Sequence, residues 1–217
     1  MSTSGKERVL YSFKGGADGS SPYSGLIDVN GALYGTAGGG VNDQGTVFKV
    51  STSGTETVLY SFKGETDGSF PFGGLINVNG TLYGTTIYGG ANSLNCCSIS
   101  NIAGTVFAVS TSGAERVLYS FKGGTDGSFP YSSLTAIKGE LYGTTEGGGA
   151  NICSNLPAGC GTVFEVNTAG TENMLYNLGT DGGQLRGADL IAVSRDLYGT
   201  TYSGGVNGYG TVFRVSL

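Results

Sequence analysis

Aromatic and amide side chains recur at matched positions along the chain and could bind a ligand that has both apolar faces and polar groups. A tyrosine or phenylalanine follows three of the prolines, and further tyrosines lie in glycine-rich segments; the set is Tyr23, Phe72, Tyr88, Tyr131, Tyr202 and Tyr209. Asn92 and Asn151 each end a recurring Gly-Gly-Ala-Asn. Stacking rings and hydroxyl-bonding amides are what a sugar or peptide site needs. The alternative is structural, with rings packed beneath loops and asparagines forming turns.

Carboxylates near one arginine could do acid–base chemistry. Glu146 stands where other repeats have an apolar or aromatic residue, and the segment with Arg186 and Asp189 departs from the pattern of the other copies. Because glycosidases work with paired carboxylates, Glu146 with Asp181 or Asp189 is one hypothesis for a catalytic pair. The alternative is the ordinary drift of single repeats.

Four cysteines fall in two long segments: Cys96, Cys97, Cys153 and Cys160. Cys153 and Cys160 lie close enough in one segment for a disulfide, which an even cysteine count favours. Cys96 and Cys97 are adjacent and could form a vicinal disulfide. The alternatives are free thiols, pairing between the two segments, or zinc on four thiolates, which no Cys-x-x-Cys spacing supports.

An Asp-Gly pair recurs in each copy, at Asp18, Asp67, Asp126 and, in a divergent form, Asp181. Four carboxylates on one ring would suggest calcium, but the EF-hand spacing is absent. Aspartate before glycine is a turn former that bonds its own backbone, and this interpretation is favoured. We therefore expect no cofactor, with an ion in a central channel as the alternative.

Composition excludes several classes of function. The chain has 217 residues, 42 glycines, no histidine, and a net charge of −5 with only 11 lysines and arginines. Histidine-based triads and histidine-bound zinc are excluded. A basic footprint for nucleic acid is missing, and no segment is long and apolar enough to span a bilayer. We expect no nucleic-acid partner and no membrane insertion.

Four copies of one set of motifs must position these residues. Leu-Tyr-Gly-Thr begins at residues 33, 82, 141 and 197, and Gly-Thr-Val-Phe begins at residues 45, 104, 161 and 210. Each copy contains four short apolar runs of strand length without a helical period. Run A covers residues 26–29, 75–78, 134–137 and 190–193. Run B opens with Leu-Tyr-Gly-Thr, and run C contains Val-Phe-x-Val. Run D covers residues 9–13, 58–62, 117–121 and 174–178. Asn-Gly between runs A and B, at Asn30 and Asn79, predicts tight hairpins.

The repeats predict an all-β protein, a four-bladed β-propeller with four antiparallel strands per blade. The chain opens with a run D and its last copy ends at run C, so we expect the N-terminal strand to complete the last blade and close the ring. The single domain, 1–217, then holds blade 1 at about 24–62, blade 2 at about 73–121, blade 3 at about 132–178, and blade 4 at about 188–217 plus 6–13. The B–C and D–A loops share one end of each blade and are long and variable, so function is expected there.

These motifs resemble the Gloeo-Verruco (GloVer) tandem-repeat family, whose units carry GTVF, LYSF, DG-x-P and LYGTT with GG stretches. The resemblance covers essentially the whole chain. It implies an extracytoplasmic or cell-surface β protein, often with a C-terminal anchor, and it implies no established activity and no site residues. The sequence opens inside a repeat without a secretory signal, so a signal has been removed or the protein is made without one.

Together these observations favour a secreted or cell-surface, non-catalytic binding module whose long-loop face holds a glycan or another surface ligand. A second hypothesis is a glycoside hydrolase or lyase that uses Glu146, Asp189 and Arg186. A third is a structural or self-associating surface protein, suggested by the low charge and high glycine content.

Overall fold

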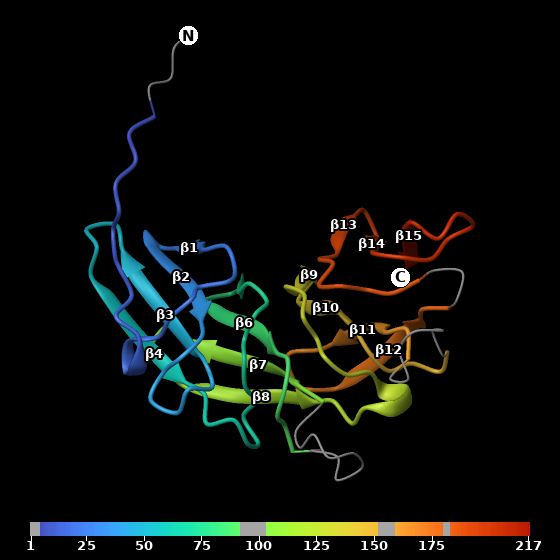
Figure 1. The fold of residues 1–217 in the computed structure, drawn as a ribbon, viewed down its shortest axis with the longest axis horizontal. Helices are drawn as coiled ribbons and strands as arrows, with labels where there is room; N and C mark the ends of the chain where they lie inside the picture. Colours follow the sequence, from blue (N-terminus) through green and yellow to red (C-terminus); the bar gives the residue numbers. More distant parts are fainter. Residues whose placement is uncertain (1–4, 92–102, 152–158, 180–182) are drawn as a thin grey trace.

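The computed structural model describes residues 5–91, 103–151, 159–179 and 183–217. Within these ranges, fifteen strands form four antiparallel sheets that follow one another along an arc (Figure 1). Within the described residues, helix is limited to two 3-10 turns, η1 (Gly16–Asp18) and η2 (Gly124–Asp126). The all-β prediction is therefore confirmed.

Each repeat forms one sheet, with its apolar runs as successive strands. The first sheet contains β1 (Ile27–Val29), β2 (Ala32–Ala37), β3 (Thr46–Ser51) and β4 (Glu56–Ser61). The second contains β5 (Ile76–Val78), β6 (Thr81–Thr86), β7 (Thr105–Ser110) and β8 (Glu115–Ser120). The third contains β9 (Thr135–Ile137), β10 (Glu140–Thr145), β11 (Thr162–Val166) and β12 (Glu172–Asn177). The fourth has three strands, β13 (Ile191–Val193), β14 (Asp196–Thr201) and β15 (Thr211–Ser216).

Local sequence explains the strand connections. In the β1–β2 turn, Asn30 and Gly31 have φ values of 55° and 81°, and Asn79 and Gly80 repeat this with 53° and 84°. Positive φ at both central residues is what a type I′ hairpin turn requires, so the predicted hairpins are confirmed. A register shift follows Val47 where β3 pairs with β4, and it recurs in the second and third sheets. A bulge of this kind increases the local strand twist, so these three sheets share it.

The core lies between neighbouring sheets rather than within any one of them. Between the first and second sheets, buried side chains pack from both sides: Val29, Tyr34, Val47 and Phe62 against Leu75, Leu82, Phe107 and Val109. The same positions pack between the second and third sheets. The glycine of Leu-Tyr-Gly-Thr makes room for the ring of run C, because a Cβ at Gly84 would lie 2.6 Å from Cζ of Phe107.

The prediction that the N-terminal strand closes the ring is wrong for this structure. Residues 7–13 form no strand, and among the described residues β15 pairs with β14 alone. The N-terminal segment instead packs its side chains on the first sheet, with Leu10, Tyr11 and Phe13 against Phe48 and Val50. The first and fourth sheets lie at opposite ends of the arc (Figure 1). The repeat pattern determines each sheet, but the angle between sheets decides whether the arc closes.

The long loops gather on one side of the sheets, as predicted. Isolated bridges join the first three D–A loops to the B–C loops of the sheets that follow them, at Ser20 with Gly38, Ser69 with Tyr88, and Ser128 with Gly147. This pairing gives the loops a fixed backbone frame. Side chains on them are therefore held relative to one another across adjacent sheets.

Candidate ligand-binding site

Two D–A loops hold a phenylalanine in an unusual backbone conformation. Phe70 and Phe129 each precede a proline and have φ values of 56° and 58°, in the left-handed region that bulky residues rarely adopt. The Phe70 N–H donates to the carbonyl of Gln44 at 2.7 Å, and its own carbonyl accepts the N–H of Ile87 at 3.2 Å. The Phe129 carbonyl likewise accepts the N–H of Glu146 at 2.9 Å. Strain of this kind persists where the surroundings hold it, and it clusters at functional sites.

Six rings from three D–A loops and one B–C loop contact one another in series and are here called the aromatic row: Tyr23, Phe70, Phe72, Tyr88, Phe129 and Tyr131. The rings that follow the prolines make one line, with centroids 4.2 Å apart for Tyr23 and Phe72 and 5.7 Å apart for Phe72 and Tyr131. A second line runs beside it, because the ring of Tyr88 lies edge-on to both Phe70 and Phe129 at 5.8 Å. The two lines meet where Phe70 stacks with Phe72 at 6.4 Å. The row thus crosses loops from three repeats.

The row ends at a pocket of about 330 Å³ that is lined by Tyr131, Glu146, Arg186 and Gly187. Arg186 Nε lies 3.9 Å from Glu146 Oε1, and Gln184 Nε2 donates to the same oxygen at 3.4 Å. The Arg186 guanidinium also lies over the ring of Tyr202, 5.0 Å from its centroid. An aromatic wall, a carboxylate and a guanidinium therefore line one hollow, and the Gln184 amide is bonded to that carboxylate.

Electrostatic coupling shows that these groups share one environment. Burial raises the pKa of Glu146, while the Arg186 charge and the Gln184 hydrogen bond act in the opposite direction. The pKa of Tyr131 is raised, first by burial and then by Tyr88 and Glu146, with Arg186 opposing. The arrangement offers hydrogen-bond donors and acceptors beside stacking faces.

Several predicted site residues lie elsewhere or have other partners. Asp189 Oδ1 accepts the backbone N–H of Ser133 at 2.7 Å, which ties the third repeat to the fourth, and Asp189 is not among the described residues that line the pocket. Asn151 Nδ2 donates to the carbonyl of Leu178 at 3.0 Å, which holds its loop to the end of run D. Tyr209 is 92% exposed and is not one of the rings that contact the aromatic row. Asn92 and Asp181 lie outside the described residues.

Of the four cysteines, the structure describes Cys160. It is buried in the apolar layer between the third and fourth sheets. Cys96, Cys97 and Cys153 lie outside the described residues. The disulfide between Cys153 and Cys160, and the vicinal one, stay predictions.

The repeated aspartates are bonded within the chain, which supports their interpretation as turn formers. Asp67 accepts the hydroxyl of Tyr60 at 2.6 Å and the backbone N–H of Lys63 at 3.0 Å. Asp126 accepts from the equivalent Tyr119 at 2.6 Å and from the following lysine at 2.7 Å. Each aspartate thus joins the end of one D strand to its own loop.

Sequence reasoning missed Phe70, Phe129 and Gln184. The two phenylalanines could have been found by aligning the residue before proline, which is serine in the first copy and phenylalanine in the next two. Gln184 occupies the same place in the divergent fourth copy, since its carbonyl accepts the N–H of Tyr202 at 2.8 Å. Its amide then reaches Glu146, a contact that no local pattern could indicate.

The successive antiparallel sheets, packed face to face with the B–C and D–A loops on one side, define a β-propeller-like repeat protein. The model of the Gloeobacter/Verrucomicrobia repeat matches residues 1–157 and again residues 98–217. The chain belongs to this family, and the resemblance seen in its motifs is confirmed. No curated protein matches it significantly. No helix among the described residues is long and apolar enough to cross a membrane.

This chain spans well under half the length of the two solved structures described next. The phage phi92 endosialidase aligns with a TM-score of 0.50 at 12% identity, over 86% of this chain and 33% of its own. The Bacteroides ovatus protein titled xyloglucan PUL GH43B aligns with a TM-score of 0.46 at 18% identity, over 90% of this chain and 39% of its own. At this level of identity the likeness concerns the fold alone.

Proposed function

We propose that the chain is a non-catalytic module that binds a glycan along the aromatic row, with one end of the glycan in the Glu146–Arg186 pocket. The observation that carries the proposal is the line of rings Tyr23, Phe72 and Tyr131, spaced 4.2 and 5.7 Å apart and leading into that pocket. Rings present flat apolar faces to the C–H faces of sugars, and a polar pocket binds hydroxyl groups. Tyr23 is 60% exposed, so its ring is accessible to a ligand.

The proposal includes a location outside the cytoplasm, which the family resemblance and the cysteine pattern support. The predicted disulfide between Cys153 and Cys160 is its measurable sign, because such bonds persist in oxidising compartments. Peptide mapping of the unreduced protein purified from its native host would detect the bond. Finding both thiols free in that material would contradict the proposed location.

A glycan array followed by calorimetry on the best ligand tests the binding proposal. Since an endosialidase shares the fold, sialylated glycans belong on the panel together with neutral ones. We expect Tyr23→Ala and Tyr131→Ala each to weaken binding about tenfold, roughly 1.4 kcal/mol, as central aromatic contacts do. Tyr209→Ala is the matched control, since this tyrosine lies on the same face outside the row. Equal affinity of all three variants and the unmodified protein would refute the proposal.

The hydrolase hypothesis has one specific observation in its favour, the half-buried Glu146 whose pKa is raised by burial beside an arginine. A glycosidase needs a second carboxylate near the bond that it cleaves. Among the described residues that line the pocket, Glu146 is the only one with a carboxylate. Asp189 accepts a hydrogen bond from the backbone N–H of Ser133 instead. Binding without cleavage is therefore favoured. Glu146→Gln separates the two, because loss of product formation with binding retained would assign catalysis to Glu146.

A further inference from the structure

The N-terminal segment has the sequence of a strand but forms none. Residues 7–16 read ERVLYSFKGG, and residues 115–124 read the same ten letters. The second copy forms β8, which pairs with β7, whereas residues 7–13 have no partner strand among the described residues. The two segments have the same intrinsic preference for strand. They differ in that residues 115–120 have a neighbouring strand to pair with, whereas residues 7–13 have none in the described part of the chain.

Although it pairs with no strand among the described residues, the segment contacts the first sheet in the same way that run D of each of the first three sheets contacts the sheet that follows it. The rings of Phe13 and Phe48 meet at 5.0 Å, the same separation as Phe62 to Phe107 and Phe121 to Phe164. A Cβ at Gly54 would lie 2.5 Å from the carbonyl oxygen of Leu10, as one at Gly113 would from that of Leu59. The Tyr11 hydroxyl bonds Asp18, as Tyr60 bonds Asp67. The segment therefore occupies the position that strand D would have in a sheet placed before the first sheet.

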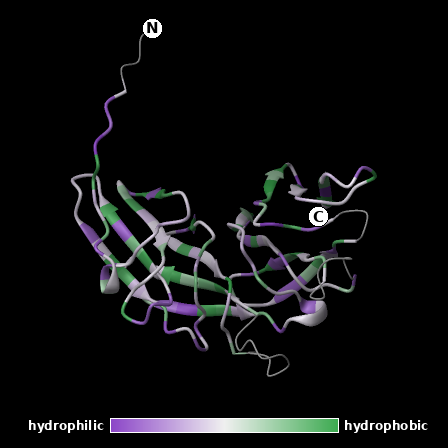
Figure 2. Ribbon diagram, viewed as in Figure 1, coloured by the Kyte–Doolittle hydropathy of each residue, from purple (hydrophilic) through white to green (hydrophobic). Residues whose placement is uncertain are grey.

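At the other end of the arc, the fourth sheet has no D strand among the residues that the structure describes. Its edge strand β15 pairs with β14 on one side only, within the described residues. Val212 of β15 is 80% exposed, whereas Val47, Val106 and Val163 at the same position of the other sheets are fully buried. Ile191 and Val193 of β13 are 62% and 51% exposed, and β13 is coloured as hydrophobic in Figure 2.

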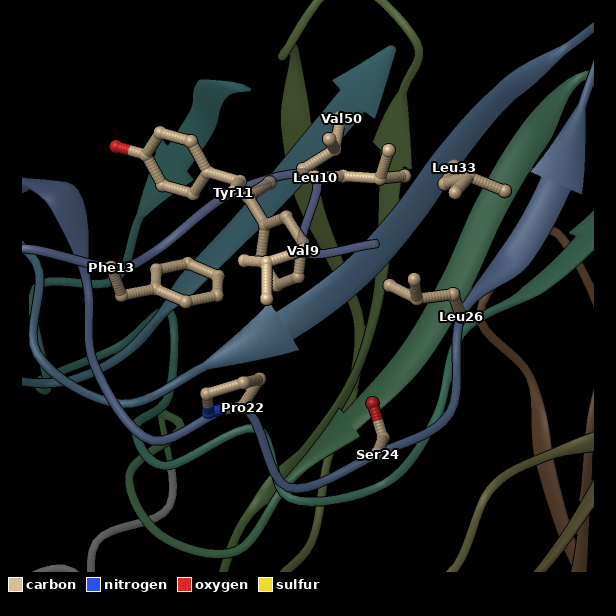
Figure 3. Close-up of a pocket in the computed structure, with 10 residues that line it drawn as sticks. Val9, Leu10, Tyr11, Phe13, Pro22, Ser24, Leu26, Leu33 and Val50 are labelled. Carbon is tan, nitrogen blue, oxygen red and sulfur yellow. The ribbon is translucent and has the colours of Figure 1, made fainter. Parts of the chain in front are cut away.

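Beside the N-terminal segment lies a groove of about 350 Å³ whose lining includes Leu10, Phe13, Leu26, Leu33, Phe48 and Val50 (Figure 3). In every internal interface, the equivalents of Leu26, Leu33, Phe48 and Val50 come from the following sheet. The equivalents of Leu10 and Phe13 come from run D of the preceding sheet. The preceding sheet also contributes the last residue of run A, the tyrosine of run B and the first valine of run C, and the groove has no residues at these positions. Val193, Tyr198 and Val212 of the fourth sheet occupy those positions. The two free ends are thus complementary halves of the interface that the chain already forms internally.

We propose that a second copy of this chain docks head to tail, so that residues 7–13 of one copy add to β15 of the other as its fourth strand. The register follows from the other sheets, where Lys49 faces Thr57 and Phe48 faces Val58. It places Arg8 opposite Arg214 and Val9 opposite Phe213. Strand addition gives the outer edge of β15 a neighbouring strand, and it covers Val212 and Val193 with the groove of the partner copy.

Directed cross-linking tests the register between chains. Chains carrying Arg8→Cys are mixed with chains carrying Arg214→Cys and oxidised gently, so that a bond between these two positions can form only between copies. We expect a covalent dimer whose linked peptides contain residues 8 and 214. The matched control is Arg8→Cys mixed with Lys49→Cys, because Lys49 has the position of Arg214 on a strand whose partner β4 is present. Equal cross-linking in the control mixture would overturn the proposal.

Light scattering after size exclusion gives the second measurement, on the unmodified 217-residue chain and on Val212→Asp. We expect a mass of at least two chains for the unmodified protein and a single-chain mass for the variant. Val212 is exposed in the single chain, so Val212→Asp should keep the circular dichroism spectrum and the subunit fold. A single-chain mass for the unmodified protein at the highest soluble concentration would refute the proposal, as would an unchanged oligomer in the variant.

Discussion

The second and fourth sheets have nearly the same sequence pattern but different surroundings. Val106 of β7 is fully buried, whereas Val212, its counterpart on β15, is 80% exposed. The second sheet lies between two neighbours, and the fourth has a neighbour on one face only (Figure 1). The first sheet is exposed on its other face, since Leu26 is 51% exposed whereas its counterpart Leu75 in the second sheet is 2% exposed. Burial in this protein is therefore a property of the stacked sheets, not of the single repeat.

The largest difference between the two sheets should appear when a charge is placed at these valines. Val106→Asp puts a carboxylate into a fully buried site and should cost about 4 kcal/mol of unfolding free energy or more. Val212→Asp should change the stability of the single chain by about 0.5 kcal/mol or less, because its side chain faces solvent. Denaturant unfolding at low protein concentration measures both. Similar losses for the two variants would mean that the fourth sheet is covered in the isolated chain.

An intermediate effect is expected at the turns between runs C and D. Gly113 has a φ of 94°, and a Cβ there would lie 2.5 Å from the carbonyl oxygen of Leu59 on the neighbouring sheet. Gly80 has a φ of 84° and open space around it. Both alanine variants carry a left-handed penalty of roughly 1 kcal/mol, and Gly113→Ala should lose roughly 2 kcal/mol more through the clash.

Gly54→Ala sharpens this comparison, because its Cβ would meet Leu10 of the unpaired N-terminal segment. In the dilute single chain that segment can move away, so the loss should equal that of Gly80→Ala. Thermal and denaturant unfolding of the three variants checks the order. A loss at Gly54 as large as at Gly113 would show that residues 7–13 are held as firmly as a paired strand.

The smallest effect is expected from pH, and it should arise at the internal interfaces. Burial raises the pKa of Glu115 and of Glu172 to about 7, with Asp67 and Asp126 adding to the rise and Tyr60 and Tyr119 opposing it through hydrogen bonds. Lys63 and Lys122 also oppose it. A raised carboxyl pKa means that the folded state binds the proton more tightly than the unfolded state does. The stabilisation is complete below pH 4.5 and is lost as the pH rises through about 7.

The melting temperature should therefore fall between pH 5 and pH 8, by a few degrees at most because both carboxyls are partly exposed. Glu115→Gln should reduce this slope, and Glu115→Gln with Glu172→Gln should reduce it further. Glu7→Gln is the matched control, since Glu7 has the same place in the repeat but lies on the exposed N-terminal segment. A slope that is unchanged in the double variant would assign the pH dependence to other groups.

Much of the candidate site could be predicted from the sequence, because it repeats. Tyr23, Phe72 and Tyr131 follow prolines at matched positions, and repetition on equivalent loops places them side by side. A catalytic hypothesis from the sequence names Glu146 and Arg186 together, but neither their contact nor the Gln184 hydrogen bond to Glu146 follows from the repeat pattern. Charge suggests Asp189 as a second carboxylate beside Glu146, whereas in the structure Asp189 accepts the backbone N–H of Ser133. Contacts between a divergent loop and its neighbours depend on backbone paths that no repeat pattern encodes.

By itself the sequence determined the elements: the hairpin turns at Asn-Gly, the four apolar runs, the glycine that admits the run C ring, and the face that carries the loops. These follow from local conformational preferences and from comparison among copies. Tertiary structure alone decided that the arc stays open, that residues 7–13 have no partner strand within the described part of the chain, and that Val212 is exposed while Val106 is buried. Ring closure depends on the angle at which successive sheets pack, and that angle is set by contacts between repeats rather than by the pattern within one.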